Sequence, residues 1–182
     1  MKSQNYQNLI HCLHVEIVGA NHKFTWGRAL RRYFRNHNIR YIFWWRIASY
    51  FFHKGGSKND RKAYRINRKL ISRYGIEIEL GASIAPGISF AHFQGTVISR
   101  ASVIGKNFHI RQNTTIGIKQ QKNSKIVIGD NVTIGANSCI IGDNLTIGNN
   151  VTIGAMAFIN KNIPDNCVCY TSQTLNIKSL SQ

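Results

Sequence analysis

Acidic residues are scarce in this chain of 182 residues, with 7 Asp and Glu against 24 Lys and Arg, and the formal net charge is +17. The imbalance is uneven along the sequence. Residues 1–75 hold sixteen basic and two acidic side chains, whereas residues 76–182 hold eight basic and five acidic ones. Net charge carries information about partners rather than about the fold. The two parts of the chain are therefore expected to have different partners or different functions.

Long apolar runs are also missing, and cysteine is infrequent. The most apolar stretch, 41–52, is shorter than the roughly 18 residues that a membrane span needs, and it contains Arg46. The first residues lack the apolar core of a signal peptide. The four cysteines do not suggest a disulfide framework, since Cys167 and Cys169 are too close together for easy bridging. These features predict a cytoplasmic protein with reduced thiols.

Histidine is sparse in the second part of the chain. Beyond residue 75 the sequence holds only His92 and His109. A zinc site built from three histidines is therefore disfavoured there, and no metal is expected.

An aliphatic residue recurs every six residues through most of the segment 80–162. The recurring positions are Ile84, Phe90, Ile98, Ile104, Ile110, Ile116, Ile128, Ile134, Ile140, Ile147, Ile153 and Ile159. A period of six fits neither an amphipathic helix nor a hairpin meander. It fits a parallel β-helix, in which each hexapeptide supplies one short strand and one corner, and the aliphatic residue stacks inside.

The basic N-terminal segment has a helical pattern. Between 25 and 53, apolar and aromatic residues recur at spacings of three and four, with arginines between them. Thr25 is a candidate N-cap, 36–38 a candidate break and 55–56 a stop. A second basic helix is expected over 60–73. With a helical lead-in over 1–24, the sequence predicts two or three helices before the repeats begin.

Three interpretations of this helical region remain open. Its aromatic face could cover the open end of the β-helix, which any solenoid needs. It could also make a peripheral contact with the inner membrane surface, because aromatic residues with Arg and Lys suit anionic lipid. Nucleic-acid binding is the third interpretation, supported by charge alone.

The repeats resemble a known family. The run 128–143, followed by 146–155 and by Ile163-Pro164-Asp165, is similar to the hexapeptide-repeat acyltransferases, and most of all to their serine acetyltransferase-like branch. The resemblance covers roughly 74–166. It implies a left-handed β-helix, a homotrimer with active sites between subunits, and acetyl-CoA as co-substrate. We therefore expect a basic helical region over 1–75, an acyltransferase domain over 76–166, and a C-terminal tail over 167–182.

His92 lies where the six-residue period fails. The step from Phe90 to Ile98 is eight residues, so the residues around His92 must bulge out of a coil. The resemblance places the catalytic histidine here. An imidazole can take the proton of an attacking hydroxyl near neutral pH, which predicts His92 as general base. Glu77 matches the family's carboxylate position and is the expected partner of His92, with Glu79 as second choice.

The resemblance also implies positions for the acetyl donor. Acetyl-CoA would lie along the groove between neighbouring β-helices, at Gly117, Ala136, Ala155 and Lys161. The same residues could instead be corners that the fold requires. The oxyanion would be held by a backbone N–H of an adjacent coil.

A second irregularity lies at 118–125. We interpret it as an extruded loop, because two in-register hexapeptides would place Lys122 inward without a partner. Lys125 lies near the position where the family's loop carries a second histidine, and Arg100 replaces an acidic residue of its substrate pocket. His109 is expected on the surface.

These differences favour a sugar hydroxyl as acceptor over serine. The sequence thus predicts an O-acetyltransferase of a capsular or other surface polysaccharide, acting on an acidic glycan or a sugar precursor, with Arg100 and Lys125 binding the substrate. A serine O-acetyltransferase is the alternative within the same fold. A non-catalytic basic module bound to membrane or nucleic acid is the alternative from another class. The expected location is the cytoplasm, with a peripheral position on the inner face of the membrane as a variant.

Overall fold

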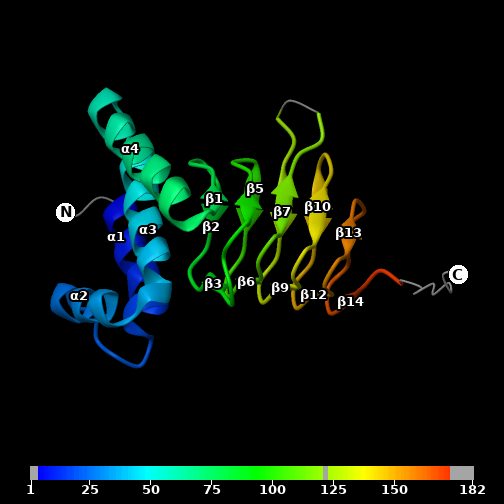
Figure 1. Ribbon diagram of the computed structural model, residues 1–182, viewed down its shortest axis with the longest axis horizontal. Helices are drawn as coiled ribbons and strands as arrows, with labels where there is room; N and C mark the ends of the chain where they lie inside the picture. The colour runs from blue at the N-terminus through cyan, green and yellow to red at the C-terminus, as the bar shows by residue number, and fades with distance from the viewer. Residues whose placement is uncertain (1–3, 121–122, 173–182) are drawn as a thin grey trace, which may run out of the picture.

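The computed structural model describes residues 4–120 and 123–172, and it shows a helical region joined to a parallel β-helix (Figure 1). The strands form three parallel sheets. Sheet A contains β1 (Glu77–Ile78), β4 (Val97–Ile98), β7 (Thr115–Gly117), β10 (Cys139–Ile141) and β13 (Phe158–Ile159). Sheet B contains β2 (Ser83–Ile84), β5 (Ser102–Ile104), β8 (Ile126–Ile128) and β11 (Leu145–Ile147). Sheet C contains β3 (Ser89–Phe90), β6 (His109–Ile110), β9 (Thr133–Ile134), β12 (Thr152–Ile153) and β14 (Val168–Cys169). The predicted left-handed parallel β-helix with an N-terminal helical region is confirmed.

The repeating isoleucines form the core of the β-helix. Ile98, Ile116 and Ile140 pair in register along sheet A, and each is fully buried. Side chains that face inward on a short strand cannot be covered by their own coil, so each coil depends on its neighbours for burial. The six-residue period therefore identified the inward positions correctly.

After the first coil, asparagines occupy the corner between sheets B and C. Asn107, Asn131, Asn150 and Asn166 all have a positive φ, which Asn tolerates better than most residues. Their amides form a ladder, in which the Nδ2 of Asn107 donates to Asn131 at 3.0 Å and the Nδ2 of Asn131 donates to Asn150 at 3.0 Å. The ladder keeps this corner in register from coil to coil.

The stretch 118–125 connects β7 of sheet A directly to β8 of sheet B. These eight residues therefore replace a single corner, and the predicted extruded loop is confirmed. Its flanks are anchored: the backbone N–H groups of Lys119 and Gln120 donate to the Oδ1 of Asp143 at 3.2 and 3.3 Å. Lys122 lies outside the described residues.

Four α-helices precede the coils, so the prediction of two or three is wrong. They are α1 (Gln4–Leu13), α2 (Trp26–Arg35), α3 (Arg40–Lys54) and α4 (Ser57–Tyr74), with a π-helical turn η1 (His14–Val18) and a 3-10 turn η2 (His37–Ile39). The break at 36–39 divides the predicted long helix into α2 and α3. Thr25 is confirmed as the N-cap of α2, since its Oγ1 accepts the N–H of Arg28 at 3.2 Å. None of the described helices is both long and apolar enough to cross a bilayer.

Helix α3 covers the open end of the β-helix. Trp45 is fully buried, and its Nε1 donates to the carbonyl of Ile78 in the first coil at 3.2 Å. Tyr41, also buried, contacts Phe90 edge to face with 6.1 Å between ring centroids. The interpretation of the helical region as a cover for the first coil is thus confirmed.

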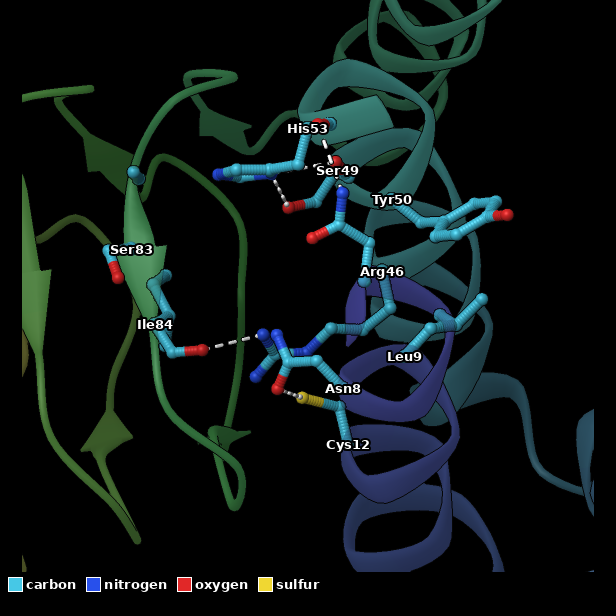
Figure 2. Close-up of a pocket in the computed structure, with 11 residues that line it drawn as sticks. Asn8, Leu9, Cys12, Arg46, Ser49, Tyr50, His53, Ser83 and Ile84 are labelled. Atoms are coloured by element: carbon cyan, nitrogen blue, oxygen red, sulfur yellow. Dashed lines mark hydrogen bonds between the residues drawn. The ribbon is translucent and has the colours of Figure 1, made fainter. Parts of the chain in front are cut away.

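A buried ion pair joins Arg46 of α3 to Glu16 of η1, and Arg46 also hydrogen-bonds to Ile84 in the first coil, as Figure 2 shows. Arg46 is 5% exposed, and its NH2 lies 2.6 Å from the Oε1 of Glu16. The guanidinium also donates to the carbonyls of Ile84 at 2.7 Å and Ala85 at 2.9 Å, while Glu16 accepts the N–H of Gly87 at 3.0 Å. Nearby charge and hydrogen bonds are needed to keep such a pair favourable inside a protein. Arg46 and Glu16 thus provide hydrogen-bond partners for backbone carbonyl and N–H groups of the first coil.

Candidate active site

His92 lies in the loop that joins β3 of sheet C to β4 of sheet A. The corresponding loops of the next three coils, at 111–114, 135–138 and 154–157, join the same two sheets. Together these four loops form one edge of the β-helix, which we call the C–A edge. The edge between sheets A and B, called the A–B edge below, is formed by the loops at 99–101, 118–125, 142–144 and 160–162.

The loop around His92 is held from both sides. Gly95 donates its N–H to the carbonyl of Gly75, at the end of α4, at 2.7 Å, and Gln94 accepts the N–H of Asn113 in the next coil at 2.9 Å. Gly95 has a φ of +70°, and a Cβ there would collide with the Oδ1 of Asn113. The predicted bulge is confirmed, and backbone hydrogen bonds to α4 and to the next coil hold it in place.

His92 itself is exposed at the tip of this fixed loop. Its ring makes no hydrogen bond to any of the residues that the structure describes. The neighbouring Phe93 packs edge to face on Tyr74, with 5.7 Å between ring centroids. The backbone is therefore anchored while the imidazole stays available to a ligand.

The imidazole opens onto a pocket of about 580 Å³ between the loop and the helical region. The far wall consists of Arg73 and Tyr74 at the end of α4 and His37 of η2. Arg73 lies over the Tyr74 ring at 5.8 Å, and the His37 ring lies 6.0 Å from it. Sequence reasoning missed these residues and included Arg73 only as the end of a basic helix. Its closeness to Gly75, where the chain enters the first coil, was the available signal.

A second hollow, of about 100 Å³, lies where α1 and α3 meet the first coil (Figure 2). Arg46 lines it, but its guanidinium is already engaged by Glu16 and by two carbonyls. The Cys12 thiol there donates to Asn8 at 3.9 Å, and burial raises its pKa to about 11. A thiol with so high a pKa is a poor nucleophile. The His92 pocket is therefore the better candidate site.

Glu77 lies in β1, whose register pairs it with Val97 just after the His92 loop. Its N–H donates to the carbonyl of Thr96 at 2.9 Å. The strand of Glu77 thus lies beneath the bulge, as expected from coils that stack in register. No hydrogen bond joins its carboxylate to His92 within the described residues, so its role as partner stays a prediction.

Glu79 is engaged elsewhere, with Arg100. The N–H of Arg100 donates to Oε2 at 2.8 Å, and its guanidinium lies 3.3 Å from Oε1. Burial tends to raise the pKa of Glu79, but the hydrogen bonds from Arg100 outweigh it, and the pKa is lowered. Arg100 therefore has a partner within its own chain.

The fold divides the remaining predicted site residues between the two edges. Ala136 and Ala155 lie on the C–A edge with His92, whereas Arg100, Gly117, Lys125 and Lys161 lie at or beside the A–B edge. Lys125 is exposed, and its N–H donates to the Oδ1 of Asn144 at 3.4 Å. Within one chain, sheet A separates Arg100 and Lys125 from His92.

Small residues recur on the C–A edge. Ala136 accepts the N–H of Met156 at 2.8 Å, so the coils contact each other closely here. A Cβ on Gly135 would collide with the backbone of Ala155, which makes Gly135 a requirement of the fold. A Cβ on Gly117 would meet nothing within 4 Å, so packing does not explain that glycine. The role of these positions in binding acetyl-CoA stays a prediction.

His109 lies on sheet C, outside the candidate site. Its Nδ1 is 2.9 Å from the Oγ of Ser89, and it is half-buried. Burial and, secondarily, the charge of Arg111 lower its pKa. Among residues 4–120 and 123–172, no three His, Cys, Asp or Glu side chains are grouped so that they could hold a metal ion.

Comparisons with known proteins add to this geometry, although no family model matches the sequence. The chain is 38% identical over 87 residues to chloroplastic serine acetyltransferase 1 of Arabidopsis thaliana, covering 46% of this chain and 28% of that protein. It is 36% identical over 110 residues to serine acetyltransferase of Buchnera aphidicola, covering 57% of this chain and 42% of the relative. The chain is similar to serine acetyltransferases. It spans less than half the length of these curated relatives.

Solved serine acetyltransferases share the fold over almost the whole chain. Isoform 3 from Entamoeba histolytica, in complex with cysteine, superimposes with a TM-score of 0.75 at 25% identity, covering 97% of this chain and 62% of that one. The Neisseria gonorrhoeae enzyme in complex with serine gives a TM-score of 0.70 at 23% identity, covering 91% and 66%. The latter identity supports the fold alone.

These comparisons contradict the predicted sugar acceptor. The matching relatives are serine acetyltransferases, which favours the alternative over a capsular polysaccharide or another acidic glycan. The prediction rested on Arg100 and Lys125 as unusual substrate contacts. Within one chain, both residues lie on the edge away from His92, and the guanidinium of Arg100 is paired with Glu79.

Proposed function

We propose that this chain transfers the acetyl group of acetyl-CoA to the hydroxyl of L-serine, with His92 as general base. The observation that carries the proposal is an exposed imidazole on a rigidly anchored bulge that faces a pocket, in a β-helix similar to serine acetyltransferases. The fixed loop matters because a general base contributes only when it is held within hydrogen-bonding reach of the proton it removes.

In the proposed reaction, His92 accepts the proton of the serine hydroxyl as the oxygen forms its new bond to carbon. The acetyl thioester supplies the carbonyl that is attacked. A backbone N–H of the neighbouring coil stabilises the charge that develops on the carbonyl oxygen. His92 then returns the proton to the departing sulfur, and Glu77 steadies the imidazolium between these steps. Ala136 and Ala155, with Gly117 and Lys161, are the proposed contacts of the donor.

We further propose that the complete site forms between copies of the chain, in a homotrimer. The two edges that bear the predicted residues flank sheet A on opposite sides. If the C–A edge of one subunit faces the A–B edge of the next, the residues that one chain keeps apart would line a single groove. Lys125 would then approach His92 across the subunit boundary.

The test is an acceptor panel with purified full-length protein and acetyl-CoA, monitored by thiol release and by mass spectrometry of the product. We expect acetylation of L-serine, with D-serine and neutral sugars as controls that give no product. Thiol release that does not depend on L-serine, or acetylation of a sugar in preference to it, would overturn the proposal.

Arg73 is expected to recognise the carboxylate of the substrate. It is exposed in the pocket that His92 faces, whereas Lys125 of the same chain lies on the other edge. A charge-assisted hydrogen bond contributes about 1.5–3 kcal/mol, which is roughly a 10- to 150-fold effect on binding. Arg73→Met keeps most of the alkyl contact with Tyr74, so we expect KM for L-serine to rise by about that factor, with KM for acetyl-CoA unchanged.

Arg68→Met is the matched control, because Arg68 is an exposed cation on the same helix outside this pocket. Steady-state kinetics should show no change for it. An equal rise in KM for both variants would mean that only the general positive charge of α4 attracts the substrate.

A further inference from the structure

Helix α2 carries an apolar stripe that the protein does not cover. Trp26, Leu30 and Phe34 recur every four residues, so they lie on one face of the helix. They are 40%, 44% and 70% exposed, whereas Ala29 is the only fully buried residue of this helix. In Figure 1, α2 lies at the end of the molecule opposite the last coils, below α1 and away from the sheets.

The same helix is strongly basic. Arg28, Arg31, Arg32 and Arg35 are all exposed, and the helix has no acidic residue. None of these four guanidinium groups forms an ion pair with any residue that the structure describes. The ten residues of α2 therefore carry an exposed apolar stripe and four arginines that have no carboxylate partner among the described side chains.

Helix α4, elsewhere in the helical region, is also strongly positive. The exposed residues of α4 include seven cations, which are Lys58, Arg61, Lys62, Arg65, Arg68, Lys69 and Arg73. The helix bears a single acid, Asp60. Residues 1–75 as a whole hold sixteen basic and two acidic side chains. Such a field attracts anionic surfaces over about a Debye length.

The charge argues against a second copy of this chain as the cover. Two copies joined through α2 would bring two strongly basic helical regions together, and like charges across an interface are costly. Nucleic acid would satisfy the arginines, but it would leave the exposed apolar side chains without a role. An anionic lipid surface satisfies both features at once.

We infer that α2 docks the protein on the surface of an anionic membrane. Trp26, Leu30 and Phe34 enter the boundary between headgroups and acyl chains, and the arginines of α2 contact lipid phosphates. Interfacial helices use this combination of a partly inserted apolar face and electrostatic attraction, and they lie in the plane of the membrane without spanning it. The cationic face of α4 adds attraction without insertion, because its exposed large apolar side chain is a single Tyr64.

The experiment is flotation of the full-length protein with vesicles of phosphatidylcholine, with and without 30% phosphatidylglycerol. We expect binding to the anionic vesicles that weakens as salt is raised, and little binding to the neutral ones. The double variant Leu30→Ser with Phe34→Ser should bind the anionic vesicles at least about tenfold more weakly, because both side chains are exposed and would otherwise be buried in lipid. Tyr170→Ser, which removes a 73% exposed aromatic from the other end of the molecule, should bind as the wild type does.

Circular dichroism shows whether the double variant is folded, and sedimentation shows whether its assembly state has changed. No binding to anionic vesicles would overturn the inference. So would binding that the double variant retains in full, because charge alone would then explain it. A double variant that changes the assembly state while lipid binding is absent would assign the stripe to a contact between copies. Equal losses in the double variant and in Tyr170→Ser would mean that the effect is not specific to α2.

Discussion

Replacing His92 with alanine is expected to lower kcat for the acetylation of L-serine by about 10²–10⁴-fold, the range that general base catalysis contributes. The hydroxyl would then have to lose its proton to water in the transition state. KM for acetyl-CoA should change little, because the proposed donor contacts lie on later coils. Initial rates at saturating acetyl-CoA measure the effect.

The same variant should be as stable as the wild type. His92 is exposed and forms no hydrogen bond with the described part of the chain, while the loop is held through Gly95 and Gln94. His109→Gln is the matched control, since it removes the other histidine of the β-helix and should leave kcat within about twofold of wild type. A His92→Ala enzyme with near-normal turnover would show that another group removes the proton.

Replacing Arg46 with methionine is expected to lower the free energy of unfolding by about 3–5 kcal/mol, the usual cost of breaking a buried ion pair by removing one partner. The side chains of Arg46 and Glu16 are only 6% and 1% exposed, so the carboxylate would remain buried without its charge partner. The carbonyls of Ile84 and Ala85 would also lose their donors. Denaturation by urea measures the loss.

Arg100→Met provides the comparison. It removes the cation of the Arg100–Glu79 pair, whose side chains are 65% and 30% exposed, and such pairs contribute only about 0–1 kcal/mol. The double variant Arg46→Met with Glu16→Gln should recover part of the stability, since no isolated charge is left inside. Equal losses from Arg46→Met and Arg100→Met would contradict the assigned role of the buried pair.

Much of the fold could be predicted from the sequence, because the β-helix repeats one physical rule. Every sixth residue points inward and must be apolar, so isoleucines such as Ile98 and Ile116 reveal both the period and the register. The eight-residue step around His92 was visible for the same reason. A regular scaffold makes its irregularities easy to find.

Other features depend on contacts that no local pattern encodes. Arg46 was noted only as a charge within the apolar stretch 41–52, and its burial was not predicted. Its burial depends on Glu16, thirty residues earlier, and on carbonyls of a coil that begins thirty residues later. Arg73 was likewise placed in the pocket by the direction in which α4 enters the first coil, and the sequence does not specify that direction.

The acceptor prediction relied on Arg100 and Lys125 without considering where the coils place them. Each coil contains three strands, so counting strands in threes places Arg100 on a different edge from His92. The sequence reasoning compared residue types at these positions without asking which edge they occupy. Residue types alone therefore could not decide the acceptor, because Arg100 and Lys125 would reach His92 only across a contact between subunits.

The most direct test of the central claim is the formation of O-acetyl-L-serine by the purified chain from L-serine and acetyl-CoA, followed by mass spectrometry. The account predicts an acetylated product that needs both substrates, appears with wild type and His109→Gln, and falls by at least about a hundredfold with His92→Ala. Absence of that product from a folded protein that binds acetyl-CoA, or its undiminished formation by His92→Ala, would contradict it.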